Sequence, residues 1–113
     1  MNKMRLILAA IFIAISVYTI ITISEHGWNL FPVFFGDMAA MGWQGQFNFD
    51  FMCFLILSGL WGSWRHHFSV LGLILGFFAF LGGALFLSAY LFINSYKVNG
   101  NVNALLLGAQ RAA

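Results

Sequence analysis

Charged residues are the scarcest class in this chain. Only 7% of its 113 residues are Asp, Glu, Lys or Arg, whereas 62% are hydrophobic. Soluble domains carry about 25% charged residues. The composition therefore excludes an ordinary soluble domain and predicts an integral membrane protein. Because the chain is short and no linker or low-complexity tract divides it, we expect one domain over residues 1–113.

Positive charge is also sparse, and it is scattered along the chain. The formal net charge is +2, and no run or stripe of Lys and Arg occurs that would follow a phosphate backbone. The cations are Lys3, Arg5, Arg65, Lys97 and Arg111. This distribution excludes nucleic acid as an expected partner and leaves the lipid bilayer as the expected surroundings.

Cysteine and the common metal-binding spacings are almost absent. The single Cys53 cannot form an internal disulfide, and its place in an apolar run is typical of a small buried side chain. The sequence contains neither Cys-x-x-Cys nor His-Glu-x-x-His. His66 and His67 are adjacent, so on a helix their side chains point about 100° apart. We therefore predict no metal site and no catalytic residue, and we do not expect an enzyme.

Three apolar runs are long enough, or nearly long enough, to cross a hydrocarbon core about 30 Å thick. They cover residues 4–23, 49–64 and 68–93. Because the second run is short and the third is long, we expect the third to tilt and the second to reach the interface through anchoring side chains. The predicted fold class is all-α, with three transmembrane helices.

The connection between the first two runs is too aromatic for a solvated loop. Within residues 28–43, Pro32 suits the first turn of a short helix, whereas Gly36 and Gly42 would interrupt or end it. We predict a short interfacial segment that lies along the membrane surface. The tail, residues 98–113, begins with turn residues and then has an apolar run too short to span. We interpret that run as a surface or partner contact.

Orientation follows from the positions of Lys and Arg relative to the spans. Lys3, Arg5 and Arg65 fall on one side, whereas residues 24–48 contain no Lys or Arg. We therefore predict a cytoplasmic N-terminus and, after three crossings, a C-terminus on the outside. Amphipathic side chains at the ends of the runs are the expected interface anchors. These anchors are Trp28, Trp43, Trp61, Trp64 and Arg65.

Asp50 is the one carboxylate inside an apolar run, where a charge costs at least ~2.5 kcal/mol. In one interpretation it is a boundary residue: Asn48 caps the second helix, and Asp50 in the first turn faces the positive end of the macrodipole. In the other, Asp50 shares an outer-side cavity with Glu25, His26 and Asp37. Such a cluster would bind an ion or the polar head of a hydrophobic molecule. The sequence leaves both interpretations open.

Small residues recur at spacings that let membrane helices approach closely. In the third run they form a Gly-x-x-x-Gly pattern with its continuation, and in the second run they form two pairs at the same spacing. The predicted helix-packing residues are Gly72, Gly76, Ala79, Gly83, Ser58, Gly59, Gly62 and Ser63. Because three short helices enclose little interior, much of the aromatic surface is left for lipid, a quinone or pigment, or another protein.

Three short motifs resemble those of small bacterial membrane proteins of three to four helices, which are classed as domains of unknown function. They are Tyr-Thr-Ile-Ile at residues 18–21, the sequence Phe49-Asp50-Phe51, and Ser-Gly-Leu-Trp at residues 58–61 before Arg65. The resemblance implies a helical membrane fold and transfers no activity. We accordingly expect a bacterial inner membrane protein.

Two functional hypotheses agree with these features. We favour a non-catalytic accessory subunit or assembly factor of a larger membrane complex, respiratory or photosynthetic, whose larger subunits would be the partners. The alternative is a binder or carrier of a hydrophobic small molecule or an ion that uses Asp50, Glu25, His26 and Asp37. The sequence specifies no cofactor. Bound lipid, quinone or pigment at an aromatic surface is the class we would expect.

Overall fold

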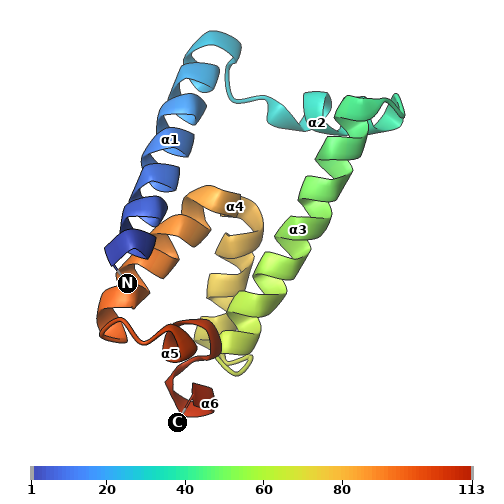
Figure 1. The fold of residues 1–113 in the computed structure, drawn as a ribbon. Coiled ribbons are helices and arrows are strands. Elements are labelled where there is room, and N and C mark those ends of the chain that lie inside the picture. The colour runs from blue at the N-terminus through green and yellow to red at the C-terminus, as the bar shows by residue number, and fades with distance from the viewer. Residues whose placement is uncertain (1, 113) are drawn as a thin grey trace.

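The computed structural model describes residues 2–112, and in that range all regular structure is helical (Figure 1). The elements are α1 (Asn2–His26), α2 (Leu30–Ala39), α3 (Trp43–Arg65), α4 (Val70–Lys97), α5 (Val102–Leu107) and α6 (Ala109–Ala112). The predicted all-α class is therefore confirmed. Two helices, α1 and α4, are long and apolar enough to cross a membrane, judged by length and composition.

Helix α4 is broken in its middle, at Gly83. This residue has φ +56° and ψ −136°, a backbone conformation that glycine adopts readily and other residues adopt only with strain. The helical hydrogen-bond ladder cannot continue through it, so α4 consists of two arms, residues 70–82 and 84–97. Each arm is about 20 Å long. Neither arm alone covers a hydrocarbon core of about 30 Å.

The two arms of α4 fold back on each other as a hairpin (Figure 1). The rings of Phe78 and Phe86, one on each arm, stack with their centroids 6.4 Å apart. Eight residues of straight helix would place these two positions about 12 Å apart. Tyr90 on the second arm contacts Trp61 near the end of α3, with ring centroids 5.9 Å apart. The second arm thus returns to the end of the molecule where the first arm begins.

The third predicted span, residues 68–93, falls largely in α4, which is one of the two candidate spans, but the expectation of an unbroken helix is wrong because Gly83 interrupts it. The second predicted span, residues 49–64, falls in α3, which is not among the candidates found within residues 2–112, so the predicted number of three spans is not confirmed.

The last turn of α4 lies beside the first turns of α1, where Arg5 Nε donates to Ser95 Oγ over 2.9 Å. The two ends of the described chain consequently lie at the same end of the molecule (Figure 1). Sequence reasoning places them on opposite sides, because it treats Gly83 as one more packing residue in a straight helix.

Helix α3 and the first arm of α4 pack with their backbones in close contact. A Cβ added at Gly59 would lie 2.9 Å from the Gly76 carbonyl oxygen, and one at Gly72 would lie 3.0 Å from the Ser63 carbonyl oxygen. Distances this short leave no room for a side chain at either crossing. All eight predicted packing residues are buried: Ser58, Gly59, Gly62, Ser63, Gly72, Gly76, Ala79 and Gly83.

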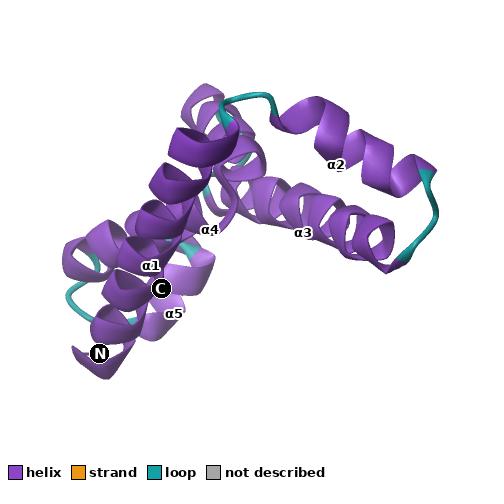
Figure 2. Cartoon of the chain, turned by 90° about the horizontal axis from the view of Figure 1, so that it is seen from above, coloured by secondary structure: helices purple, strands orange, loops and turns teal. Residues whose placement is uncertain are grey.

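Helix α2 connects the far ends of α1 and α3 (Figures 1 and 2). Its backbone rests on α3, since a Cβ added at Gly45 would lie 2.8 Å from Met38 Cα. The Asn48 side chain donates from Nδ2 to the Phe34 carbonyl oxygen over 3.1 Å. Pro32 lies in the first turn of α2, as predicted, but Gly36 does not interrupt the helix.

Helix α3 begins earlier than the sequence suggests, because its N-cap is Gly42 rather than Asn48. Trp43 is the first helical residue, so Asp50 is the eighth. Unpaired backbone N–H groups and the main effect of the macrodipole are confined to the first turn. The boundary interpretation of Asp50 therefore loses its physical basis. Asn48 instead joins α3 to α2.

Replacing Gly83 by alanine is expected to destabilise the hairpin. A Cβ would lie 3.2 Å from Phe51 Cζ at a backbone φ of +56°, and such strain costs about 1–3 kcal/mol. Thermal unfolding in detergent, followed by circular dichroism, measures the loss. Gly36→Ala is the matched control, because no atom of residues 2–112 lies within 4 Å of a Cβ added there. Equal melting temperatures for the two variants would refute the role assigned to Gly83.

Candidate functional site

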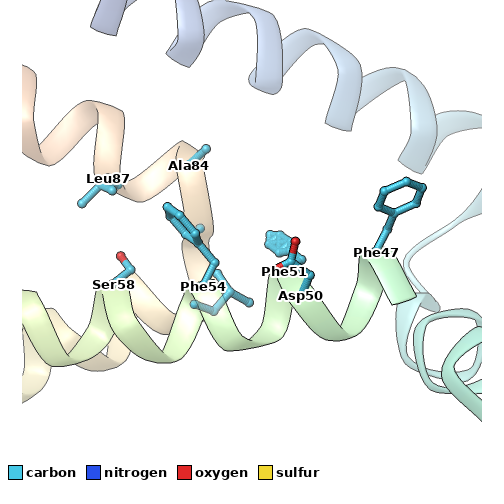
Figure 3. A pocket seen from close by; sticks show the side chains of 9 residues that line it. Phe47, Asp50, Phe51, Phe54, Ser58, Ala84 and Leu87 are labelled. Atoms are coloured by element: carbon cyan, nitrogen blue, oxygen red, sulfur yellow. The ribbon is translucent and has the colours of Figure 1, made fainter. Parts of the chain in front are cut away.

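A groove runs along one face of α3 beside the break in α4 (Figure 3). Its volume is about 330 Å³. Most of its wall is aromatic or aliphatic, and two side chains carry oxygen. The lining residues are Phe47, Asp50, Phe51, Phe54, Leu55, Ser58, Gly83, Ala84 and Leu87. Those on α3 recur every three or four residues, so they share one face of the helix. We call this site the α3–α4 groove.

Asp50 brings the only ionisable side chain among the residues that line the groove. It lies about 10 Å along α3 from Trp43, and Arg65 lies about 22 Å further along the same helix. Arg5 and Arg111 bond to groups at that far end as well. None of these arginines is therefore positioned to neutralise the Asp50 carboxylate.

The Ser58 hydroxyl is the unsatisfied polar group of the groove. Ser58 is 8% exposed, and its Oγ has no hydrogen-bond partner among residues 2–112. Two other buried serines, Ser63 and Ser88, donate to backbone carbonyl oxygens three or four residues earlier. A buried hydroxyl without a partner costs about 1–3 kcal/mol. Ser58 is consequently a group that a bound molecule would satisfy.

Asp50 and Ser58 both line the α3–α4 groove. Eight residues separate them on α3, which corresponds to about 12 Å along the helix axis. Figure 3 shows the oxygen atoms of both side chains on the side of α3 that faces the groove. The groove thus offers two polar points at either end of an apolar wall. This arrangement suits a long molecule with few polar groups.

The structure does not bring together the four polar residues that the sequence groups. Asp50 lines the α3–α4 groove, whereas His26 lines a separate cavity of about 550 Å³ at the junction of α1 and α2. Glu25 and Asp37 line neither of these cavities. Within residues 2–112, no three His, Cys, Asp or Glu side chains are grouped as a metal ion would require.

The opposite end of the molecule carries arginines that donate to the carbonyl ends of other helices. Arg5 Nη2 donates to the Ser95 carbonyl oxygen in the last turn of α4 over 3.0 Å. Its guanidinium also lies 3.8 Å from the centroid of the Tyr96 ring. The last carbonyls of a helix have no partner within it and form the negative end of its dipole. Here these carbonyl oxygens accept hydrogen bonds from the guanidinium, as a carboxylate would in an ion pair.

Arg65 makes the most buried of these contacts, at 7% exposure. Its Nε donates to the Leu105 carbonyl oxygen over 2.7 Å, and its Nη2 donates to that of Ala104 over 3.3 Å. One turn earlier on α3, Trp61 Nε1 donates to the Leu106 carbonyl oxygen over 3.0 Å. Two side chains of α3 thus cap three successive carbonyls of α5 and hold the tail in place.

The tail returns a similar contact to α3. Arg111 Nη1 donates to the Trp64 carbonyl oxygen, and its guanidinium lies 3.9 Å from the centroid of the Trp64 ring. Among the predicted anchors, Trp28 and Trp43 are exposed at the other end of the molecule. The other three predicted anchors are Trp61, Trp64 and Arg65. They form contacts between α3 and the tail instead of serving as free anchors at the membrane surface.

His66 and Tyr90 complete the cluster around Arg65. Arg65 Nη1 donates to the Tyr90 hydroxyl oxygen over 2.9 Å and lies 3.3 Å from His66 Nε2. His66 Nε2 also contacts the Tyr90 hydroxyl. Because a guanidinium only donates, Nε2 must act as the acceptor, which places the ring proton of neutral His66 on Nδ1. Burial, followed by the charges of Arg65, His67 and Lys97, lowers the pKa of His66 below its usual 6.5.

Sequence reasoning missed Tyr90 and Ser95, both of which are buried. A signal for them exists. Ser88, Tyr90 and Ser95 interrupt the apolar second arm of α4, and in a membrane helix such polar side chains face other protein segments. Their partners, Arg5 and Arg65, could not be identified from the sequence. The break in α4 decides which residues of α1 and α3 lie beside its second arm.

Acid is expected to loosen the tail from α3. Because the pKa of His66 is lowered in the folded state, the contribution of neutral His66 to stability is complete above pH 6.5 and falls as the pH drops below that value. Protonated Nε2 would point a hydrogen at Arg65. The measurement is backbone hydrogen exchange of α5 between pH 7.5 and pH 5. After correction for the intrinsic pH dependence of exchange, α5 is expected to exchange faster at the lower pH. His66→Gln should remove this extra acceleration, and His67→Gln, at an exposed position, should keep it. Identical pH profiles in both variants would contradict the role of His66.

Comparisons with known proteins found no match to this chain among family models, curated proteins or solved structures. The resemblance to small bacterial membrane proteins therefore stays a prediction.

Proposed function

We propose that this chain is a membrane-embedded, non-catalytic binding protein and that the α3–α4 groove is its binding site. The observation that carries the proposal is the buried Ser58 hydroxyl, which has no partner within residues 2–112 and lines the same groove as Asp50. Sites for small molecules combine apolar walls with a few placed polar groups. A hydrophobic molecule with polar groups at the matching positions would satisfy both side chains.

The composition of the groove supports binding rather than turnover. Acid–base or nucleophilic chemistry needs at least two groups within hydrogen-bond reach of each other. Asp50 and Ser58 are about 12 Å apart along α3, and Asp50 is the only ionisable side chain among the lining residues.

We place α1 and α3 across the bilayer and α4 as a re-entrant hairpin that enters from the arginine-bearing end. Irregular backbone at membrane depth is tolerated where it is buried in protein, and Gly83 is buried against α3. In this arrangement the cations lie at one face, and Glu25 and Asp37 lie at the other. The distribution of Lys and Arg then favours a cytoplasmic location for both termini, in a bacterial inner membrane.

Cysteine labelling tests this topology. In a Cys53→Ser background, Asn2→Cys and Gln110→Cys are expected to react with a membrane-impermeant maleimide from the same side of sealed vesicles. Asn29→Cys, in the α1–α2 connection, should react only from the opposite side. Labelling of the first two positions from opposite sides would contradict the re-entrant placement of α4.

The outer half of α1 favours a second candidate function, that of an accessory subunit. Leu8 is the buried residue of this helix, whereas Tyr18 is 73% exposed and Val17 and Ile20 are also exposed. The Tyr18 hydroxyl beside these exposed apolar side chains would suit contact with a neighbouring protein helix. A larger subunit of a membrane complex is the partner this surface would take.

Native mass spectrometry of protein extracted in mild detergent separates the two functions. Binding predicts a small-molecule adduct that Ser58→Ala weakens about fivefold, because it loses a hydrogen bond of about 1 kcal/mol, and that Asp50→Asn also weakens, because it loses the carboxylate charge. Asp37→Asn is the matched control and should keep the adduct, since Asp37 does not line the groove. Larger subunits retained equally by all variants, with no adduct on any of them, would reject the binding function and support the accessory one.

A further inference from the structure

We propose that the α3–α4 groove takes a lipophilic amine, with its ammonium head at Asp50 and its hydrocarbon body directed toward Ser58. The inference rests on the proposed binding function and adds the chemical class of the ligand. Three properties of the groove carry it: a carboxylate that none of the arginines among residues 2–112 neutralises, an aromatic wall beside that carboxylate, and a second polar point further along.

The first property is the uncompensated charge of Asp50. Arg65 lies about 22 Å away on the same helix, and the side chains of Arg5 and Arg111 are bonded at that same far end. In the proposed arrangement α3 crosses the bilayer, where a carboxylate without a partner is costly. A ligand that brings positive charge therefore gains most at this point, and an anionic head is repelled from it.

The second property is the aromatic wall. Three aromatic residues close to Asp50 in the sequence line the groove with it: Phe47, Phe51 and Phe54. Figure 3 shows the rings of Phe47 and Phe54 on the same side of α3 as the carboxylate. Ring faces carry negative potential and attract ammonium groups. An alkylammonium head is thus favoured both by charge and by the rings, whereas a neutral alcohol gains a hydrogen bond alone.

The third property is the distance to Ser58. Its unpaired hydroxyl lies about 12 Å from Asp50 along α3, and Leu55 and Leu87 line the groove with it. An alkyl chain covers this apolar stretch. A hydroxyl or carbonyl part-way along the chain would reach Ser58. The best ligand is therefore an amine with one further hydrogen-bonding group in the middle of its chain.

The experiment compares three probes with the same alkyl chain and different heads: hexadecylamine, hexadecanol and hexadecanoate. Each is added to the protein in nanodiscs, and bound probe is counted by native mass spectrometry after ejection of the complex. The amine is expected to be retained about tenfold better than the other two. Asp50→Asn should remove this preference, Asp50→Glu should keep it, and Asp37→Asn should leave it unchanged.

A second comparison tests the Ser58 end of the groove. Ser58→Ala is expected to weaken retention of an amine with a mid-chain hydroxyl about fivefold and to leave plain hexadecylamine unaffected, because only the first probe loses a hydrogen bond. Equal weakening of both probes would overturn the placement of the mid-chain hydroxyl at Ser58.

The outcomes separate the ligand class from the function on which it rests. Equal retention of all three heads, or preference for the carboxylate, overturns the amine class and leaves the binding function standing. Retention of none of the probes also overturns the amine class. If the protein extracted from its native membrane then carries no small-molecule adduct either, the binding function fails with it.

Discussion

The break at Gly83 is the constraint on which the rest of the structure depends. A straight α4 of 28 residues would extend about 42 Å and end near the acidic side of the molecule. The break returns its last turn to the start of α1, so the carbonyl ends of α3, α4 and α5 meet at one end. Arg5, Arg65 and Arg111 donate to these ends. Removing a guanidinium from water costs several kcal/mol, which charge-assisted hydrogen bonds of about 1.5–3 kcal/mol each offset. Within residues 2–112, the buried Arg65 is thus held without an ion pair, in a chain that has three acidic residues.

Helical spacing predicted those parts of the fold that depend on which face of a helix a residue occupies. Residues four apart share one face of any straight helix. This spacing predicted that Gly59 on α3 and Gly76 on α4 belong to packing faces, and the two residues do lie against each other. Gly83 fits the same spacing, so the pattern cannot distinguish a packing glycine from one that breaks the helix. The start of α3 was mispredicted for a related reason. Asn48 is the better cap by local preference, but the contact of α2 with Gly45 requires the helix to begin earlier.

The candidate site was predictable in part. A carboxylate in an apolar run identified Asp50, because the cost of such a charge is high wherever the helix lies. Its proposed neighbours do not line the same groove, because α2 joins the ends of α1 and α3 and His26 lines another cavity. Ser58 was assigned to packing alone. Its hydroxyl has no hydrogen-bond partner among residues 2–112, and no spacing on α3 indicates this.

The hairpin also accounts for the existence of the groove. A helix that passed straight along α3 would cover its face from Ser58 to Phe47, as α4 covers Gly59 and Gly62. By turning away at Gly83, α4 leaves a groove along that face. The face contains a carboxylate and an unpaired hydroxyl, although an alanine at Ser58 would be more stable by the cost of one unsatisfied group, about 1–3 kcal/mol. Polar groups that oppose stability in an otherwise apolar groove are typical of binding sites. The same backbone turn that gathers the charges at one end therefore opens the site at the other.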